Sequence, residues 1–325
     1  MKIKFSRYKK IISWSLTICC LAYIVWFFLK NTEEMKLVFK LKPLMLIILT
    51  CLFLLSDILY SLRFRIILKK SSGQTLPFWL WYKMIILGRF LTAMAPQAGN
   101  VYLSVYLKKN YQISYTRYAS SFFSFTWLDT CLNMIYTIAV VLAVNPGLRL
   151  GSFKALNILL LLTIAIAAAP LLLELIFRKT RLRMPYLSWL HSKLSEMLTV
   201  SVNNLSDGLY MLKLVITGII SFINTIIIFY ICFISLKIPA SLPILALFYV
   251  ILRLSTQIVI TPGNLGIREL AYGILSKQMN IGMAQGIVIS VIIRVLSGGI
   301  IIVLGALFGG IDLLRHRKDY EEPEQ

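Results

Sequence analysis

Thr261-Pro262-Gly263-Asn264-Leu265-Gly266-Ile267-Arg268-Glu269 breaks an apolar stretch with a proline and two glycines, and then places two opposite charges side by side. Ala95-Pro96-Gln97-Ala98-Gly99-Asn100 breaks an earlier apolar stretch in a similar way. Proline and glycine interrupt helices, and lipid cannot satisfy the backbone N–H and C=O groups that an interruption frees. We therefore expect both interruptions to be enclosed by protein or by a water-filled cavity, with their tips facing each other.

The composition of the whole chain indicates that these interruptions lie in a membrane. Of the 325 residues, 58% are hydrophobic and only 14% are charged, and the mean hydropathy is +0.80. Such values are typical of a multispanning membrane protein and exclude most soluble enzymes and secreted proteins. The net charge is +21, but the basic residues lie mostly in short connections between apolar stretches. This distribution excludes nucleic-acid binding, which needs a basic face on a folded soluble domain.

Eight hydrophobic segments are candidates for entering a bilayer, which a helix crosses in about 20 residues. They are 11–29, 43–62, 78–95, 118–144, 155–177, 212–236, 242–261 and 283–308. If all eight crossed the membrane from a cytoplasmic N-terminus, the basic connections 108–117 and 178–210 would lie outside. That arrangement would break the positive-inside rule twice.

The rule is satisfied if the two interrupted segments are re-entrant hairpins, over about 78–107 and 242–277, that enter and leave by the same face. Twenty Lys and Arg residues then lie inside, with Arg63 counted among them, and seven lie outside. We therefore expect an all-α polytopic protein of the cytoplasmic membrane, with six full transmembrane helices, two re-entrant hairpins and both termini cytoplasmic.

The expected domain organisation is one transmembrane domain over 11–310, between a basic cytoplasmic N-terminus, 1–10, and a cytoplasmic tail, 311–325. The connection 178–210 is predicted to form an interfacial helix on the inner leaflet, because its apolar residues recur at helical spacing. These residues are Leu187, Leu190, Leu194 and Met197.

The two hairpins resemble copies of one unit. The residues from Leu107 to Ser114 and those from Leu275 to Gly282 both follow the pattern L-x-K-x-x-x-I-[S/G]. Pro96 precedes Asp129 by 33 residues, and Pro262 precedes Arg294 by 32. A duplicated unit that enters from opposite faces indicates the inverted-repeat plan of many transporters, whose sites lie near the bilayer midplane.

Catalytic and metal-binding patterns are missing from the sequence. The two histidines, His191 and His316, both lie in predicted cytosolic connections, and the five cysteines include no C-x-x-C pair. There is no G-x-S-x-G, P-loop or G-x-G-x-x-G motif. We therefore expect no catalytic residue, no metal site and no cofactor. We expect the protein to be transporter-like and not an enzyme.

Nine ionisable residues are predicted at membrane depth, where an isolated charge costs about 2.5–3.5 kcal/mol on insertion scales. Six belong to the hairpins or to the crossing after each: Arg89, Asp129, Arg253, Arg268, Glu269 and Arg294. We assign these six to function, with structural ion pairing as the alternative. For Asp57, Lys83 and Glu174 we favour a structural role by snorkelling or capping.

Four arginines near two broken-helix tips suit an anion. A guanidinium group binds phosphate through two parallel hydrogen bonds, and a helix N-terminus presents free N–H groups. The candidate substrate-binding residues are therefore those six together with the tip residues Pro96, Gly99, Asn100, Pro262, Gly263, Asn264 and Gly266. The two asparagines either add hydrogen bonds or merely tolerate a left-handed turn, and Asp129 and Glu269 either neutralise the arginines or carry a coupling proton.

These motifs resemble the lysylphosphatidylglycerol synthase transmembrane-region family. The resemblance rests on the P-x-x-G tip, on the Tyr106-Leu107-Lys108-Lys109 turn and on the crossing that carries Trp127-Leu128-Asp129. It rests more specifically on P-G-x-x-G-x-R-E, which runs from Pro262 to Glu269. The first hairpin departs from the family, with Asn100-Val101 where an acidic residue often follows the glycine and Trp127-Leu128 where an E-R pair is common.

The resemblance implies a flippase-like domain that stands alone, without the soluble C-terminal transferase of the two-domain members. The expected ligand and partner is an anionic phospholipid or a polyprenyl-phosphate lipid, whose headgroup is translocated. The alternative is a non-transporting membrane subunit that presents a lipid to a separate glycosyltransferase or lipid-modifying enzyme. A membrane-embedded enzyme is disfavoured, since the metal and histidine sets are missing from the sequence.

Overall fold

The computed structural model of the chain describes residues 42–94, 97–179, 207–239, 241–257 and 266–321. Within them the helices are α3 (Pro43–Ser72), α4 (Phe78–Met94), α5 (Ala98–Tyr111), α6 (Tyr115–Val144), α7 (Ala155–Lys179), α9 (Gly208–Ser235), α10 (Leu242–Gln257), α11 (Ile267–Gln278) and α12 (Met283–Glu321). A two-stranded antiparallel hairpin, β1 (Arg149–Leu150) and β2 (Phe153–Lys154), joins α6 to α7. The predicted segment 11–29 and most of the predicted interfacial helix lie outside the described residues.

Several helix starts are fixed by capping residues. Pro43 occupies the first turn of α3, where its missing N–H costs nothing. The hydroxyl of Ser114 accepts from the Arg117 N–H at the start of α6, and the carboxylate of Asp207 accepts from the Tyr210 N–H at the start of α9. Each side chain satisfies one of the N–H groups that a helix N-terminus leaves free.

The long helices are apolar on the outside as well as on the inside. Four described helices are long and apolar enough to cross a membrane: Pro43–Ser72, Tyr115–Val144, Gly208–Ser235 and the Met283–Gly309 part of α12. The outer face of α9 exposes large apolar side chains three or four residues apart, which are Leu209, Leu212, Ile216, Ile220, Ile223, Ile227, Tyr230 and Ile234. Water would not favour such a stripe, whereas lipid does.

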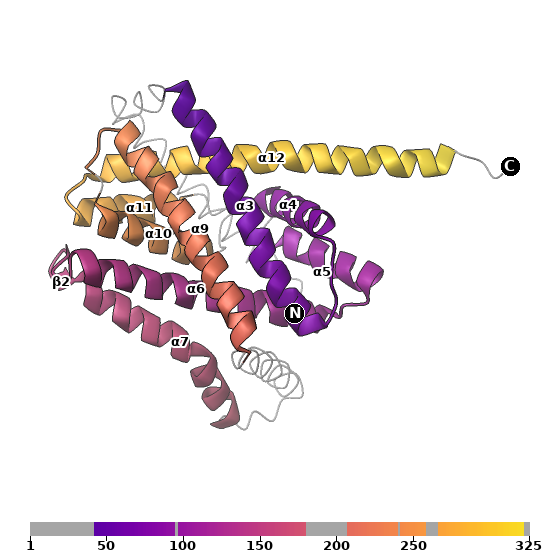
Figure 1. Ribbon diagram of the computed structural model, residues 1–325, viewed down its shortest axis with the longest axis horizontal. Coiled ribbons are helices and arrows are strands. Elements are labelled where there is room, and N and C mark those ends of the chain that lie inside the picture. Colours follow the sequence, from indigo (N-terminus) through magenta and orange to yellow (C-terminus); the bar gives the residue numbers. More distant parts are fainter. Residues whose placement is uncertain (1–41, 95–96, 180–206, 240, 258–265, 322–325) are drawn as a thin grey trace, which may run out of the picture.

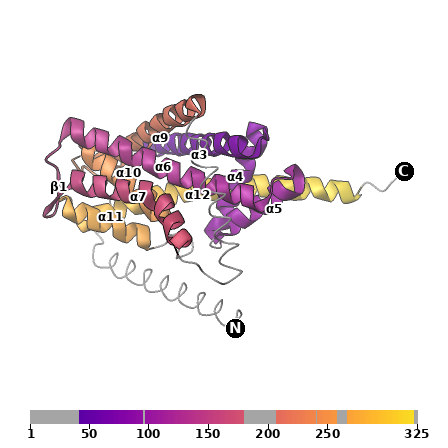
Figure 2. The same ribbon diagram turned by 90° about the horizontal axis from the view of Figure 1, so that it is seen from below.

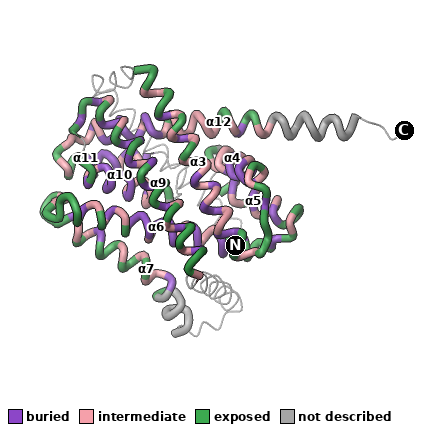
Figure 3. The backbone as a smooth tube through the Cα atoms, viewed as in Figure 1, coloured by how far each residue is buried: buried purple, intermediate pink, exposed green. Residues whose placement is uncertain are grey.

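The helices enclose a core in which segments distant in the sequence are neighbours. In Figures 1 and 2, α3 and α9 lie side by side, and these two helices are in contact. Helix α6 contacts α3, α9 and α10, and α12 contacts α3, α4 and α11. Figure 3 shows buried residues along α10 and on parts of α6, with exposed residues along the outer side of α9. Helices from the early and late parts of the chain therefore pack together, through α3 with α9, α4 with α12 and α6 with α10.

Helix α3 is longer than the hydrophobic segment that predicts it. The segment 43–62 ends before the first basic residue, but the helix continues to Ser72. The prediction that Arg63 lies in a cytoplasmic connection was wrong, because its side chain is only 3% exposed. An ion pair with Asp129 of α6 holds it inside the protein.

Helices α4 and α5 pack against each other through a very close contact at Gly99. A Cβ atom at Gly99 would lie 1.9 Å from the backbone oxygen of Gly88 and 2.3 Å from the hydroxyl oxygen of Thr92. The Gly99 N–H also donates to the Thr92 hydroxyl at 3.2 Å. Small residues that let backbones approach in this way are typical of helix packing in membranes. Gly99, a predicted site residue, therefore has a packing role.

Replacing Gly99 by alanine is expected to force α4 and α5 apart. Overpacking of this kind costs about 1–3 kcal/mol, so the apparent melting temperature of the purified protein in detergent should fall by several degrees. Gly298→Ala is the matched control, since nothing lies within 4 Å of a Cβ there. Equal melting temperatures for the two variants would contradict the close contact.

The two turns that share a sequence pattern have a similar local structure. After α5 the chain passes through Gln112, which has φ 55°, and then enters α6. After α11 it passes through Asn280, which has φ 56°, and then enters α12. In both cases a short helix leads through a left-handed residue into a long helix.

An ion pair joins the end of α3 to the start of α9. The Lys70 amino group donates to the Asp207 carboxylate at 2.5 Å. This hydrogen bond and the one from the Tyr210 N–H lower the pKa of the Asp207 carboxyl below its ordinary value. Folding thus favours the ionised form of Asp207. The ionised carboxylate stabilises the folded protein at pH values above its unfolded-state pKa of about 3.9, and this contribution is lost as the pH falls through the lowered pKa of the folded state.

The contribution of this pair should depend on pH. Asp207→Asn keeps a capping side chain but removes the charge, so it is expected to lower the apparent melting temperature slightly at pH 7. The difference from the wild type should disappear as the pH falls below about 4, through the lowered pKa of Asp207. Thermal melts of both proteins at decreasing pH check this, and a difference that stays constant as the pH falls would contradict it.

Candidate functional site

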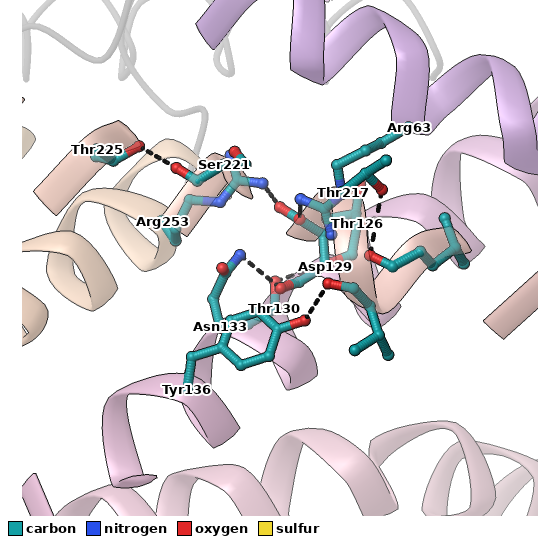
Figure 4. Close-up of polar contacts among 12 residues, drawn as sticks. Arg63, Thr126, Asp129, Thr130, Asn133, Tyr136, Thr217, Ser221, Thr225 and Arg253 are labelled. Atoms are coloured by element: carbon teal, nitrogen blue, oxygen red, sulfur yellow. Dashed lines mark hydrogen bonds and ion pairs between the residues drawn. The ribbon is translucent and has the colours of Figure 1, made fainter. Parts of the chain in front are cut away.

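Asp129 lies halfway along α6 and is shared by two arginines from different parts of the chain. Its carboxylate forms ion pairs with Arg63 of α3 and with Arg253 of α10. Figure 4 shows both guanidinium groups directed at this carboxylate. Asp129 and Arg63 are each 3% exposed as side chains, whereas Arg253 is 24% exposed. The cluster thus has one buried carboxylate, one buried arginine and one accessible arginine.

Polar groups on α6 extend this cluster along the helix. The Asn133 side-chain amide donates to the Asp129 backbone oxygen at 2.7 Å, and the Thr137 hydroxyl donates to the Asn133 backbone oxygen at 2.9 Å. The Tyr136 hydroxyl donates to the Val215 oxygen of α9 at 3.1 Å. The inner face of α6 is therefore polar over several turns.

Glu269 forms a second cluster at the start of α11. Its carboxylate accepts from Nε of Arg294 at 2.6 Å and from the Gly266 N–H at 2.8 Å. Gly266 has φ 86°, a conformation that favours glycine, so the chain can turn there and place its N–H over the carboxylate. Arg268 lies beside this pair and donates to the Ser290 backbone oxygen at 3.2 Å and to its hydroxyl at 3.3 Å.

A third pair joins α4 to α3. Arg89 forms an ion pair with Asp57, and its guanidinium group lies 5.5 Å from the ring centroid of Tyr60. Asp57, for which snorkelling or capping was predicted, is instead buried and paired with Arg89, and its structural role stays a prediction. Arg253 lies within electrostatic range of Arg89 and Arg63, so the first cluster and this pair belong to one charged region.

The charged groups are arranged with the same asymmetry in three ion pairs. The exposed fractions of arginine and carboxylate side chains are 34% and 8% for Arg89–Asp57, 24% and 3% for Arg253–Asp129, and 21% and 3% for Arg294–Glu269. In each pair the carboxylate is enclosed and the arginine is the accessible partner. Within the described residues these clusters contain five arginines and three carboxylates, which leaves an excess of two positive charges.

The tip residues contribute mainly to packing and turns where the structure describes them. The Asn100 amide donates to the Gln97 side chain at 2.7 Å, and its oxygen accepts from the Tyr118 hydroxyl at 3.0 Å. The left-handed residue of the first tip is Gln97, with φ 64°, so Asn100 is there for its hydrogen bonds. Pro96, Pro262, Gly263 and Asn264 lie outside the described residues.

The sequence did not lead us to expect Arg63 or Ser290 in the charged clusters. Arg63 was assigned to a connection, although the apolar run continues after it as Phe64, Ile66, Ile67 and Leu68, which is a signal that the helix continues. Ser290, which accepts from Arg268, has no signal in the sequence. Trp127, a departure from the family pattern, donates from its ring N–H to the Ile166 oxygen at 2.9 Å and so ties α6 to α7.

Apolar outer faces around a core of paired charges define a polytopic α-helical membrane protein. The chain belongs to a known family of such proteins, because the family model described as the lysylphosphatidylglycerol synthase TM region matches residues 11–305. This confirms the resemblance carried by the sequence motifs. Comparison with curated proteins found no match, and comparison with solved structures found none.

Proposed function

We propose that this protein is a lipid flippase-like protein of the cytoplasmic membrane, which translocates a phosphate-bearing headgroup of a phospholipid or a polyprenyl-linked lipid. The observation that carries the proposal is the excess of arginine over carboxylate in the charged clusters. An uncompensated positive charge in the membrane interior is costly, and an anionic ligand offsets that cost.

The location of the clusters supports the same proposal. Asp57 and Asp129 lie halfway along α3 and α6, so their arginine partners lie near the middle of these spans. A headgroup there would be midway between the two leaflets, where transporters built from inverted repeats place their substrates.

The mechanism follows from the repeat that the sequence indicates. In the proposal, α4 with α5 and α10 with α11 are re-entrant hairpins that enter from opposite faces, and both chain termini are cytoplasmic. The headgroup phosphate docks on Arg253, Arg268 and Arg294. The two repeats then rock against each other, which opens the site to the other leaflet.

Reconstitution into proteoliposomes tests this function. Tail-labelled phosphatidylglycerol and a tail-labelled polyprenyl phosphate are offered separately, and quenching of the outer leaflet reports movement between leaflets. At least one lipid should move faster than in protein-free vesicles. If neither moves while the purified protein retains bound lipid, the chain is a lipid-presenting subunit and the flippase proposal fails.

A further inference from the structure

We propose that the site selects phosphate headgroups that lack an amine, an inference that rests on the proposed function and defines its substrate class. The observation is the asymmetry of the three ion pairs. Arg89, Arg253 and Arg294 are 21–34% exposed as side chains, whereas the carboxylates that they contact are exposed by 8% or less.

An incoming phosphate can use this arrangement directly. It meets the accessible edge of a guanidinium group and can form two parallel hydrogen bonds with it. When Arg253 turns toward a phosphate, Asp129 keeps Arg63 as a partner. When Arg294 does so, Glu269 keeps the Gly266 N–H at 2.8 Å. Each carboxylate therefore has a second, buried partner that stabilises it during the exchange.

Within the described residues, these clusters offer a headgroup amine no accessible carboxylate. Asp57, Asp129 and Glu269 are enclosed by the helices and already paired. The positive charge of the amine would instead approach accessible arginines, and repulsion between like charges is strong where the dielectric constant is low. The amine would also lose its hydration without compensation.

Arg268 strengthens the discrimination. Within the described residues it donates hydrogen bonds to the oxygen atoms of Ser290, and its charge lies within electrostatic range of both Arg294 and Glu269. The second cluster therefore presents two arginines around one buried carboxylate. The family takes its name from lysylphosphatidylglycerol, whose lysyl group carries amines, so the inference sets the substrate of this chain apart from the lipid in the family name.

Competition between lipids, measured by native mass spectrometry, tests this selectivity. The purified wild-type protein is offered equimolar phosphatidylglycerol and lysylphosphatidylglycerol, and in a second arm equimolar polyprenyl phosphate and lysylphosphatidylglycerol. We expect the amine-free lipid to be bound at least tenfold more in one arm, and that arm identifies the lipid source. Arg253→Gln and Arg294→Gln should each reduce the ratio, whereas Lys277→Gln, an exposed position on α11, should not.

The outcomes separate this inference from the function on which it rests. Equal binding in both arms, or a preference for the lysyl lipid, would overturn the proposed selectivity. If the protein still translocates lipid in proteoliposomes, the proposed function would remain supported. If no lipid binds and none is translocated, the proposed function fails and the inference fails with it. The wild-type ratio decides the question even if a variant does not fold.

Discussion

Replacing Arg268 by glutamine is expected to reduce headgroup translocation in proteoliposomes by roughly 10- to 100-fold, because a hydrogen bond to a charged group contributes about 1.5–3 kcal/mol. Folding should be preserved. Within the described residues, the hydrogen bonds of Arg268 are to oxygen atoms of Ser290, and Glu269 keeps Arg294 and the Gly266 N–H. The substitution therefore leaves no buried carboxylate without a partner.

Lys277→Gln provides the matched control, since it removes one positive charge from the exposed face of the same helix. It should translocate lipid at the wild-type rate. Glu269 is less suitable for a test of function, because it is buried, pairs with Arg294 and accepts from the backbone at the start of α11. An Arg268→Gln protein with the wild-type rate would contradict the assignment of Arg268 to the site.

Replacing Asp129 by asparagine is expected to cause the largest loss of stability of any single substitution in the charged clusters. Arg63, with 3% of its side chain exposed, would keep its charge without a carboxylate partner. Removing one partner from a buried ion pair costs about 3–5 kcal/mol. Size-exclusion profiles and thermal melts in detergent should show little folded, monodisperse protein.

A second substitution should restore folding if the cause is the buried charge. The double variant Arg63→Met, Asp129→Leu replaces a buried pair by apolar side chains, which is often neutral or stabilising. Arg253 then remains alone, but it is 24% exposed and can keep contact with water or headgroups. A stable Asp129→Asn protein, or a double variant as unstable as the single one, would contradict the role of Asp129.

Much of the fold could be predicted because helix starts carry local signals. Pro43, Ser114 and Asp207 each lie at a helix start, and hydrophobic segments begin at or within a few residues of them. Helix ends were harder to predict. Arg63 and Arg65 interrupt the hydropathy pattern, but α3 passes through both, because an arginine with a partner can be buried inside a helical bundle.

The residues of the candidate site could be proposed from the sequence, but their contacts could not. Charges at membrane depth stand out in a sequence, since each needs a partner or a function, and this identified Asp129, Arg253 and Glu269. The sequence could not assign Asp129 to both Arg63 and Arg253, because these residues lie on three different helices that tertiary packing brings together. The re-entrant geometry of the hairpins and the inverted repeat stay predictions.

We expect the excess arginines near the middle of the spanning helices to bind a lipid phosphate. Native mass spectrometry of the gently purified protein, with fragmentation of any bound lipid, measures this directly. We expect a phosphate-bearing lipid on the wild-type protein and strongly reduced occupancy on Arg268→Gln, with full occupancy on Lys277→Gln. A wild-type protein without phosphate-bearing lipid, or an Arg268→Gln protein with equal occupancy, would contradict it.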